Sequence, residues 1–139
     1  MAQGYVLYAM RCSLYSSKAR SYMLTRGIDF VELPPGDPSY AAEVMPAIGR
    51  WIIPVLKTPD GRLVQDTEDI IELLDVDAPQ GESAYPDGGV LAVLARVLSM
   101  CGSEGMMRAA MHFRWNFDEH NMPFVLEDFG RGLAVAGND

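Results

Sequence analysis

The sequence predicts an α/β domain with the element order β-α-β-α-β-β-α, followed by a short all-helical segment. Three observations predict this class. Short apolar stretches that favour strands alternate with helical patterns through the first half of the chain. A stretch rich in proline, glycine and acidic residues follows, and beyond it apolar residues recur at helical spacing. We therefore expect an α/β domain over residues 1–75, a linker over 76–89 and a partial helical domain over 90–139.

A β-α-β unit is predicted at the start of the chain. Residues 5–9 favour a strand because tyrosine, valine and leucine suit a pleated, buried environment. Helical spacing of apolar residues begins at Ser17, and Gly27 stands where a glycine commonly ends a helix. Residues 28–33 then partly alternate apolar and polar side chains, so a second strand is expected.

A short, irregular helix is expected next. Asp37 and Pro38 resemble an N-cap followed by a proline at the first helical position. Pro46 is expected to end this helix, because proline lacks the N–H group that a helix interior needs.

A β-hairpin and a third helix complete the predicted domain. Residues 52–56 and 62–64 flank the turn sequence Thr-Pro-Asp-Gly over 58–61, in which proline presets φ and glycine tolerates a positive φ. Asp66 or Thr67 is expected to cap the third helix, because acidic residues follow that suit the positive end of a helix dipole.

Two helices, over residues 90–101 and 106–117, are predicted after the linker, with a break between them and a glycine-rich, polar tail behind them. The first has apolar residues on more than one face, and such a helix is normally buried on several sides. We therefore expect the chain to form a homodimer. Its apolar stretch carries Arg96 and is well short of the ~20 residues that span a bilayer, so no membrane segment is expected.

The charge of the chain disfavours some classes of partner. Its formal net charge is −8 at pH 7, whereas nucleic-acid binders need clustered Lys and Arg to neutralise phosphates. No nucleic-acid partner is expected, and an acidic membrane surface is disfavoured for the same reason. The N-terminus shows no basic leader and no apolar stretch of signal-peptide length, so a cytoplasmic location is expected.

The cysteines and histidines indicate neither a disulfide framework nor a metal site. Cys12 and Cys101 are far apart in the sequence and form no C-x-x-C pair, which fits a reducing compartment. His112 and His120 lack the spacing of a zinc motif, and no further ligand cluster accompanies them, so no metal is expected.

The segment from Ser13 to Arg20 resembles the junction of the first strand and first helix in glutathione S-transferases. In the serine- and cysteine-using classes of that family, the catalytic side chain lies five residues before a Lys or Arg and seven before an Arg. Ser13 has this spacing to Lys18 and Arg20. The resemblance implies that the Ser13 hydroxyl donates a hydrogen bond to the glutathione thiolate, next to a helix N-terminus that favours negative charge. A serine that only caps the helix stays open as the simpler interpretation.

Residues 53–56, with the sequence Ile-Pro-Val-Leu, resemble the V-P-x-L segment of the same family. In that family the proline is cis, and the backbone of the residue before it pairs with the cysteinyl backbone of glutathione. The resemblance assigns these positions to Pro54 and Ile53. An ordinary proline at the start of a strand is the alternative.

Residues 65–70 resemble the family segment E-S-x-A-I, with Asp66 in place of Glu and Thr67 in place of Ser. The resemblance implies that Thr67 holds the γ-glutamyl carboxylate through its backbone N–H and hydroxyl, because a helix N-terminus binds anions. It also implies that Asp66 meets the ammonium group of glutathione. A plain N-cap stays open as the alternative.

Residues 45–54 depart from the family, whose corresponding N-P-x-G-K-V-P segment is shorter. Arg50 is the candidate for the basic residue that contacts the glycine carboxylate of glutathione. Cys12 offers a competing, glutaredoxin-like thiol chemistry, because helix N-termini lower thiol pKa values. It lies one residue out of register with the motif and has no resolving cysteine. Tyr8 or Tyr15 is expected to replace Ser13 as the thiolate donor if Ser13 is only a cap.

Taken together, the resemblance implies a thioredoxin-like fold for residues 1–75 and an incomplete helical second domain. The activity it implies is that of a transferase, in which glutathione is the co-substrate and its activated thiol attacks a small electrophile. A non-catalytic, transferase-like module for protein interaction is the alternative, because a fold alone does not decide function.

Overall fold

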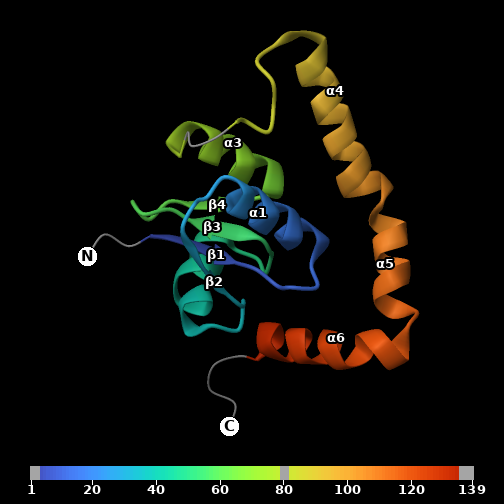
Figure 1. The fold of residues 1–139 in the computed structure, drawn as a ribbon. Coiled ribbons are helices and arrows are strands. Elements are labelled where there is room, and N and C mark those ends of the chain that lie inside the picture. Colours follow the sequence, from blue (N-terminus) through green and yellow to red (C-terminus); the bar gives the residue numbers. More distant parts are fainter. Residues whose placement is uncertain (1–3, 79–81, 135–139) are drawn as a thin grey trace.

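A four-stranded mixed sheet forms the centre of the first half of the chain (Figure 1). The computed structural model describes residues 4–78 and 82–134. The strands lie in the order β2-β1-β3-β4, with β1 parallel to β2 and antiparallel to β3, and β3 antiparallel to β4. Their bounds are Tyr5–Tyr8 (β1), Phe30–Leu33 (β2), Val55–Lys57 (β3) and Leu63–Gln65 (β4). The predicted α/β class and element order are confirmed.

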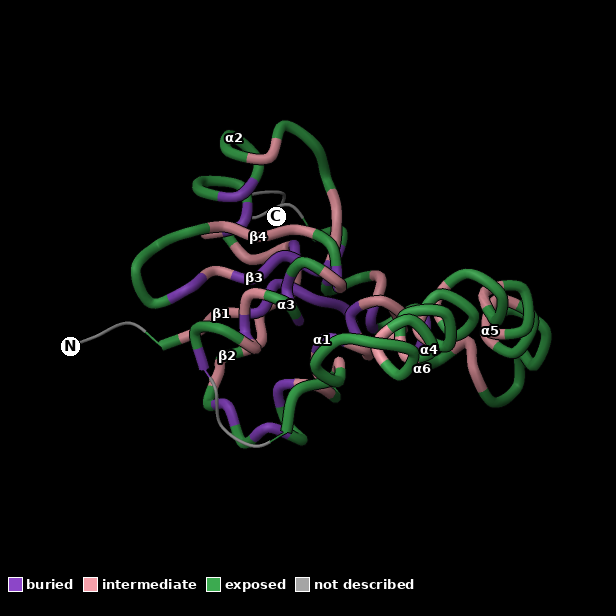
Figure 2. Tube along the Cα trace, turned by 90° about the horizontal axis from the view of Figure 1, so that it is seen from above, coloured by how far each residue is buried: buried purple, intermediate pink, exposed green. Residues whose placement is uncertain are grey.

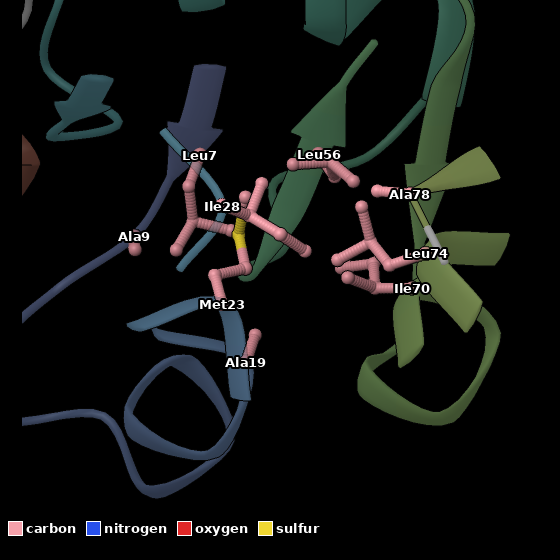
Figure 3. Close-up of a cluster of buried hydrophobic side chains, with 9 residues drawn as sticks. All are labelled: Leu7, Ala9, Ala19, Met23, Ile28, Leu56, Ile70, Leu74 and Ala78. Carbon is pink, nitrogen blue, oxygen red and sulfur yellow. The ribbon is translucent and has the colours of Figure 1, made fainter. Parts of the chain in front are cut away.

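Helices cover both faces of this sheet. Helices α1 (Leu14–Thr25) and α3 (Thr67–Asp77) pack on one face, and a π-helical turn, η1 (Tyr40–Val44), continues into α2 (Met45–Ile48) on the other. Because successive side chains of a strand point to opposite faces, Leu7 joins the cluster under α1 and α3, whereas Tyr8 packs against Tyr40 and Val44. Figure 3 shows the first cluster, in which side chains from the sheet meet those from both helices.

The helix boundaries differ from the prediction at two points of this domain. Helix α1 begins at Leu14, earlier than the predicted Ser17, because Ser13 caps it. Pro46 does not end the second helical segment but lies in the first turn of α2, where its missing N–H costs no helical hydrogen bond. Gly27 follows the C-cap of α1 with a φ of +64°, as its position predicts.

The second half of the chain is helical, and its first two predicted helices are continuous. Helix α4 (Gly89–Met100) passes through a π-helical turn, η2 (Cys101–Gly105), into α5 (Met107–Trp115). The predicted break is therefore wrong, because the glycine-containing residues of η2 widen the helix without interrupting it. Figure 2 shows this run standing beside the α/β domain with mostly exposed residues.

The continuous run, Gly89–Trp115, has 27 residues and is long and apolar enough, by length and composition alone, to cross a membrane. The helix predicted over residues 90–101 is therefore only part of a longer helical run, and its length does not exclude a membrane segment. None of the run's apolar window is buried within the chain.

A third helix, α6 (Asp118–Leu133), occupies the region predicted as a polar tail and turns back toward the α/β domain (Figure 1). Its buried residues are Val125, Asp128 and Gly132, at helical spacing. A Cβ atom at Gly132 would lie 2.6 Å from the sulfur of Met10, so a larger residue here would force the Met10 side chain to move. Helix α3 extends into the predicted linker, and the division into domains stays a prediction.

Candidate functional site

Ser13 lies at the junction of β1 and α1 and is the N-cap of α1. Its backbone is extended, with φ −82° and ψ 125°, and its Oγ atom accepts a hydrogen bond from the Ser16 N–H group at 3.2 Å. Ser13 is therefore a cap, as the simpler interpretation held. Because capping uses only an acceptor position of the oxygen, the O–H group is still able to donate to a ligand.

A cavity of about 280 Å³ opens beside Ser13, and we call it the Ser13 cavity. Ile53 lines it from the loop before β3, Met107 and Met111 line it from α5, and Phe129 lines it from α6. Arg114 is the one charged side chain among the described residues that line this cavity. The site is thus an apolar hollow between the sheet and the helical segment, with one cation in its wall.

A second cavity of about 280 Å³ lies at the N-terminus of α3, and we call it the α3 cavity. Asp66 and Thr67 line it from α3, and Arg96 and Glu104 line it from the α4–η2 run. Tyr15 lines both cavities. The Thr67 hydroxyl also donates to the Tyr15 carbonyl at 3.2 Å, so the two cavities adjoin at this residue.

Asp66 is the N-cap of α3 and has an unusual backbone. Its carboxylate accepts a hydrogen bond from the Glu68 N–H group at 2.9 Å, and its φ is +73°. A residue other than glycine in that region costs free energy, and such residues cluster at ligand sites. The Asp66 side chain is exposed, so its second carboxylate oxygen can meet a ligand.

The hydroxyl predicted to bind a ligand at Thr67 is already engaged within the chain. Thr67 is only 4% exposed, and its hydroxyl hydrogen is directed to the Tyr15 carbonyl. Its backbone N–H stands in the first turn of α3, where no helical carbonyl precedes it. The backbone group is therefore the better candidate for anion binding.

Ile53 and Arg50 occupy different surroundings. The Ile53–Pro54 peptide bond is cis, as the resemblance implies, and Ile53 lines the Ser13 cavity. Arg50 is exposed and donates to the Gln65 side chain at 3.3 Å. Among the described residues, it belongs to the lining of neither cavity. The fold therefore places Arg50 against Gln65, the residue before Asp66, but outside the two cavities.

Tyr8 and Tyr15, the alternatives to Ser13 as donor to the thiolate, both make hydrogen bonds within the chain. Tyr8 is 1% exposed, shares a hydrogen bond of 2.9 Å with the Ser39 hydroxyl and packs on Tyr40 in the core, so it faces away from the Ser13 cavity. Tyr15 donates to Glu104 at 2.9 Å, and burial together with that hydrogen bond raises the pKa of its phenol. Tyr15 lines the Ser13 cavity as well, but its hydroxyl hydrogen is engaged by Glu104, so Ser13 stays the better candidate for the thiolate donor.

Cys12 is a poor candidate for the reactive thiol. Burial, a hydrogen bond to Asp128 and the charge of Asp128 raise the pKa of Cys12 to about 11. A reactive cysteine at a helix N-terminus would show the opposite shift. In the part of the chain that the structure describes, no group of three or more His, Cys, Asp or Glu side chains could hold a metal ion.

The helical segment contributes site residues that the motifs did not reveal. Met107, Met111 and Arg114 are spaced i, i+4 and i+7, so they share one face of α5 toward the Ser13 cavity. That spacing is visible in the sequence. Phe129 and Asp128 belong to the region predicted as a tail, so recognising α6 was necessary to find them.

Comparison with known proteins identifies the relatives of the α/β domain. Residues 7–82 match the family described as "Glutathione S-transferase, N-terminal domain". No curated protein sequence matches the chain significantly.

Several solved structures share the fold. A glutathione S-transferase from Methylobacillus flagellatus with glutathione bound has 23% sequence identity and a TM-score of 0.60, over 93% of this chain and 65% of that one. Glutathione transferase Omega 3C from Trametes versicolor has 16% identity and a TM-score of 0.65, over 95% and 60% of the two chains. Glutaredoxin 2 from Salmonella typhimurium, in complex with glutathione, has 19% identity and a TM-score of 0.51, over 99% and 62%.

The similarity to these structures is one of fold, and it does not extend over their full length. The chain spans between 47% and 65% of the first three solved structures it matches.

Proposed function

The chain belongs to the glutathione S-transferase family, and we propose that it binds reduced glutathione as a co-substrate and activates its thiol for attack on a small electrophile. The observation that carries this proposal is the junction of the Ser13 cavity and the α3 cavity at Tyr15. An extended tripeptide is about 10 Å long, so it can pass from one cavity into the other.

The γ-glutamyl end of glutathione is assigned to the α3 cavity. Its carboxylate would accept a hydrogen bond from the backbone N–H of Thr67 at the positive end of the α3 dipole. Its ammonium group would meet Asp66, and Glu104 lines the same cavity as a further acidic group. The cysteinyl backbone would pair with Ile53, and the glycine carboxylate would extend out of the cavities toward Arg50, which lies outside them.

The thiol of glutathione is assigned to Ser13. An unperturbed thiol has a pKa of roughly 8.5, so only a few per cent is ionised at neutral pH. The Ser13 hydroxyl would donate a hydrogen bond to the sulfur, which favours the thiolate. The thiolate then forms a carbon–sulfur bond with the electrophile, which loses a leaving group or, in an addition, accepts a proton.

The electrophile is assigned to the Ser13 cavity. Its lining of methionine, tryptophan and phenylalanine side chains suits an apolar or aromatic molecule. During attack, negative charge moves from the sulfur onto the electrophile. Arg114 would stabilise that charge more in the transition state than in the ground state, which is what accelerates a reaction.

A calorimetric titration with reduced glutathione tests this function. We expect saturable binding to the parent chain. Asp66→Asn keeps the cap of α3 but removes the charge, so it should weaken binding by roughly two- to fivefold, the range of an exposed ion pair. Asp69→Asn removes an exposed charge from the same helical turn and should leave affinity unchanged. Absence of saturable binding at millimolar glutathione would exclude the proposed function.

A role as an interaction module is the second candidate, and the exposed face of α4 favours it. Val90 is 83% exposed, Leu91 65% and Val93 64%. We propose that this face pairs with a second copy of the chain in the cytoplasm. A pure interaction module would pair in this way without binding glutathione, so the same titration separates the two functions.

A further inference from the structure

A buried carboxylate from α6 contacts the loop that carries Ser13. Asp128 is 6% exposed. It accepts hydrogen bonds from the Cys12 N–H group at 2.7 Å and the Arg11 N–H group at 3.2 Å. These are the two residues that precede Ser13. The helical segment therefore holds the backbone of this loop as well as lining the cavity beside it.

Asp128 carries its negative charge in this environment. Burial by itself would raise the pKa of Asp128. Hydrogen bonds from the Cys12 thiol and from the backbone N–H groups of Cys12 and Arg11 outweigh burial and lower that pKa below its usual value. A buried charge needs such partners to be tolerated.

This charge opposes ionisation of the neighbouring thiol. Burial, the hydrogen bond to Asp128 and the Asp128 charge raise the pKa of Cys12 to about 11. Compared with an ordinary thiol of pKa roughly 8.5, the thiolate fraction at neutral pH falls by more than about a hundredfold. Because the thiolate is the nucleophilic form, Cys12 is unreactive although it lies beside a helix N-terminus, which would otherwise lower its pKa.

The cations around Cys12 do not cancel this effect. Arg114, on α5, donates to the Cys12 carbonyl and lowers the pKa of Cys12, but less than Asp128 raises it. Arg20, on α1, donates to the Met10 carbonyl and is paired with Glu32. Arg11, in the loop itself, interacts with Asp128.

We infer that Asp128 selects which side chain of this loop performs chemistry: its buried carboxylate accepts hydrogen bonds from the backbone N–H groups of Arg11 and Cys12 and places a negative charge beside the Cys12 side chain. Activation of glutathione is thereby left to Ser13, and thiol exchange at Cys12 is suppressed. Asp128 is a positioning residue, because it acts through its neighbours. The statement about Ser13 rests on the proposed function, whereas the statement about Cys12 does not.

The pH dependence of Cys12 alkylation tests this inference without glutathione. In a Cys101→Ser background, Cys12 is the one thiol of the chain. The rate of its reaction with iodoacetamide is measured by mass spectrometry between about pH 6 and 10. In the parent we expect the rate to keep rising through this range. Asp128→Asn should lower the midpoint by at least about one unit, which makes alkylation about tenfold faster near pH 8.

Glu127→Gln is the matched control, because Glu127 is the exposed neighbour of Asp128 and pairs with Arg131 at the surface. Its alkylation rate should match that of the parent at every pH in this range. If Asp128→Asn raised the alkylation rate by the same factor at every pH, Asp128 would act only by shielding the Cys12 thiol from the reagent. The inference would then be overturned. A parent midpoint near 8.5 would overturn it as well.

A second variant keeps the inference testable if Asp128→Asn fails to fold. Arg114→Gln removes the cation that opposes Asp128, so it should raise the midpoint and slow alkylation. An unchanged or faster rate would contradict the electrostatic account. Glutathione titration of the parent reports separately on the proposed function, so either idea can fail alone.

Discussion

Replacing Ser13 with alanine or aspartate separates its structural role from its proposed chemical role. In the structure, the Ser13 Oγ atom accepts from the Ser16 N–H group at 3.2 Å. Alanine removes this cap, which should lower the free energy of unfolding by about 1 kcal/mol. Aspartate caps as well as serine does, so Ser13→Asp should keep the stability of the parent.

The two variants should behave differently toward the bound thiol. Alanine loses the hydroxyl donor, so the pKa of bound glutathione should rise by about one unit, equivalent to about 1.4 kcal/mol. An aspartate carboxylate offers no proton and repels the thiolate, so Ser13→Asp should raise that pKa further, despite its intact cap. Urea unfolding measures the stability, and the ultraviolet absorbance of the thiolate measures the pKa.

The result that would refute this reasoning is an unchanged thiol pKa in both variants. Ser13 would then be a helix cap without a chemical role. A second contrary result is a thiol pKa that is raised in Ser13→Ala but equals the parent value in Ser13→Asp. The pKa would then depend on the helix cap and not on the hydroxyl.

Arg114→Met should lower kcat/KM for an aromatic electrophile by about tenfold or more at unchanged glutathione affinity, whereas Arg108→Met, at an exposed position of α5, should change neither. Light scattering should report a dimer for the parent and a monomer for Leu94→Glu, since Leu94 is 50% exposed on α4; a monomeric parent that binds no apolar dye would contradict this. Burial would raise the pKa of Glu68, but hydrogen bonds from Lys18, Tyr85 and Ser99 lower this pKa below the usual 4.5. As the pH falls, Glu68 therefore becomes protonated in the unfolded chain before it does in the folded chain. The stability that Glu68 contributes is present above pH 4.5 and is lost as the pH falls to the pKa of Glu68 in the folded chain. Thermal unfolding across this range should show a smaller acid loss in Glu68→Gln.

The elements of the α/β domain were predictable because their signals are local. The β1 segment, with its tyrosine, valine and leucine residues, and the Thr-Pro-Asp-Gly turn identify strands without knowledge of the rest of the chain. A cap at Asp66 or Thr67 was likewise recognisable from the acidic residues behind them, and the structure shows that it is Asp66. In each case the interaction that forms the element lies within a few residues of the signal.

The helical segment was less predictable because its signals depend on tertiary contacts. In α6, the charged Asp128 interrupts the buried stripe between Val125 and Gly132, so the stripe does not look apolar. Its charge is accommodated by donors from the distant β1–α1 loop. A glycine such as Gly132 ordinarily disfavours a helix, but here the Met10 side chain packs against it.

The sequence motifs named some of the residues that line the two cavities, but not the hydrogen bonds that these residues make. The motifs named Ser13, Ile53 and Thr67, and the fold brings them to two adjoining cavities. The sequence does not reveal that the Thr67 hydroxyl is taken by the Tyr15 carbonyl, because that partner comes from a different element. Nor does it reveal that Arg50 lies outside both cavities.

The measurement that tests the central claim most directly is a map of backbone amide chemical shifts during titration of the isotope-labelled chain with reduced glutathione. The account predicts that the amides of Ser13, Ile53 and Thr67 shift together and saturate at the same glutathione concentration, because one tripeptide contacts all three. Shifts confined to α4 and α5, or shifts at these three amides that saturate at different concentrations, would contradict it.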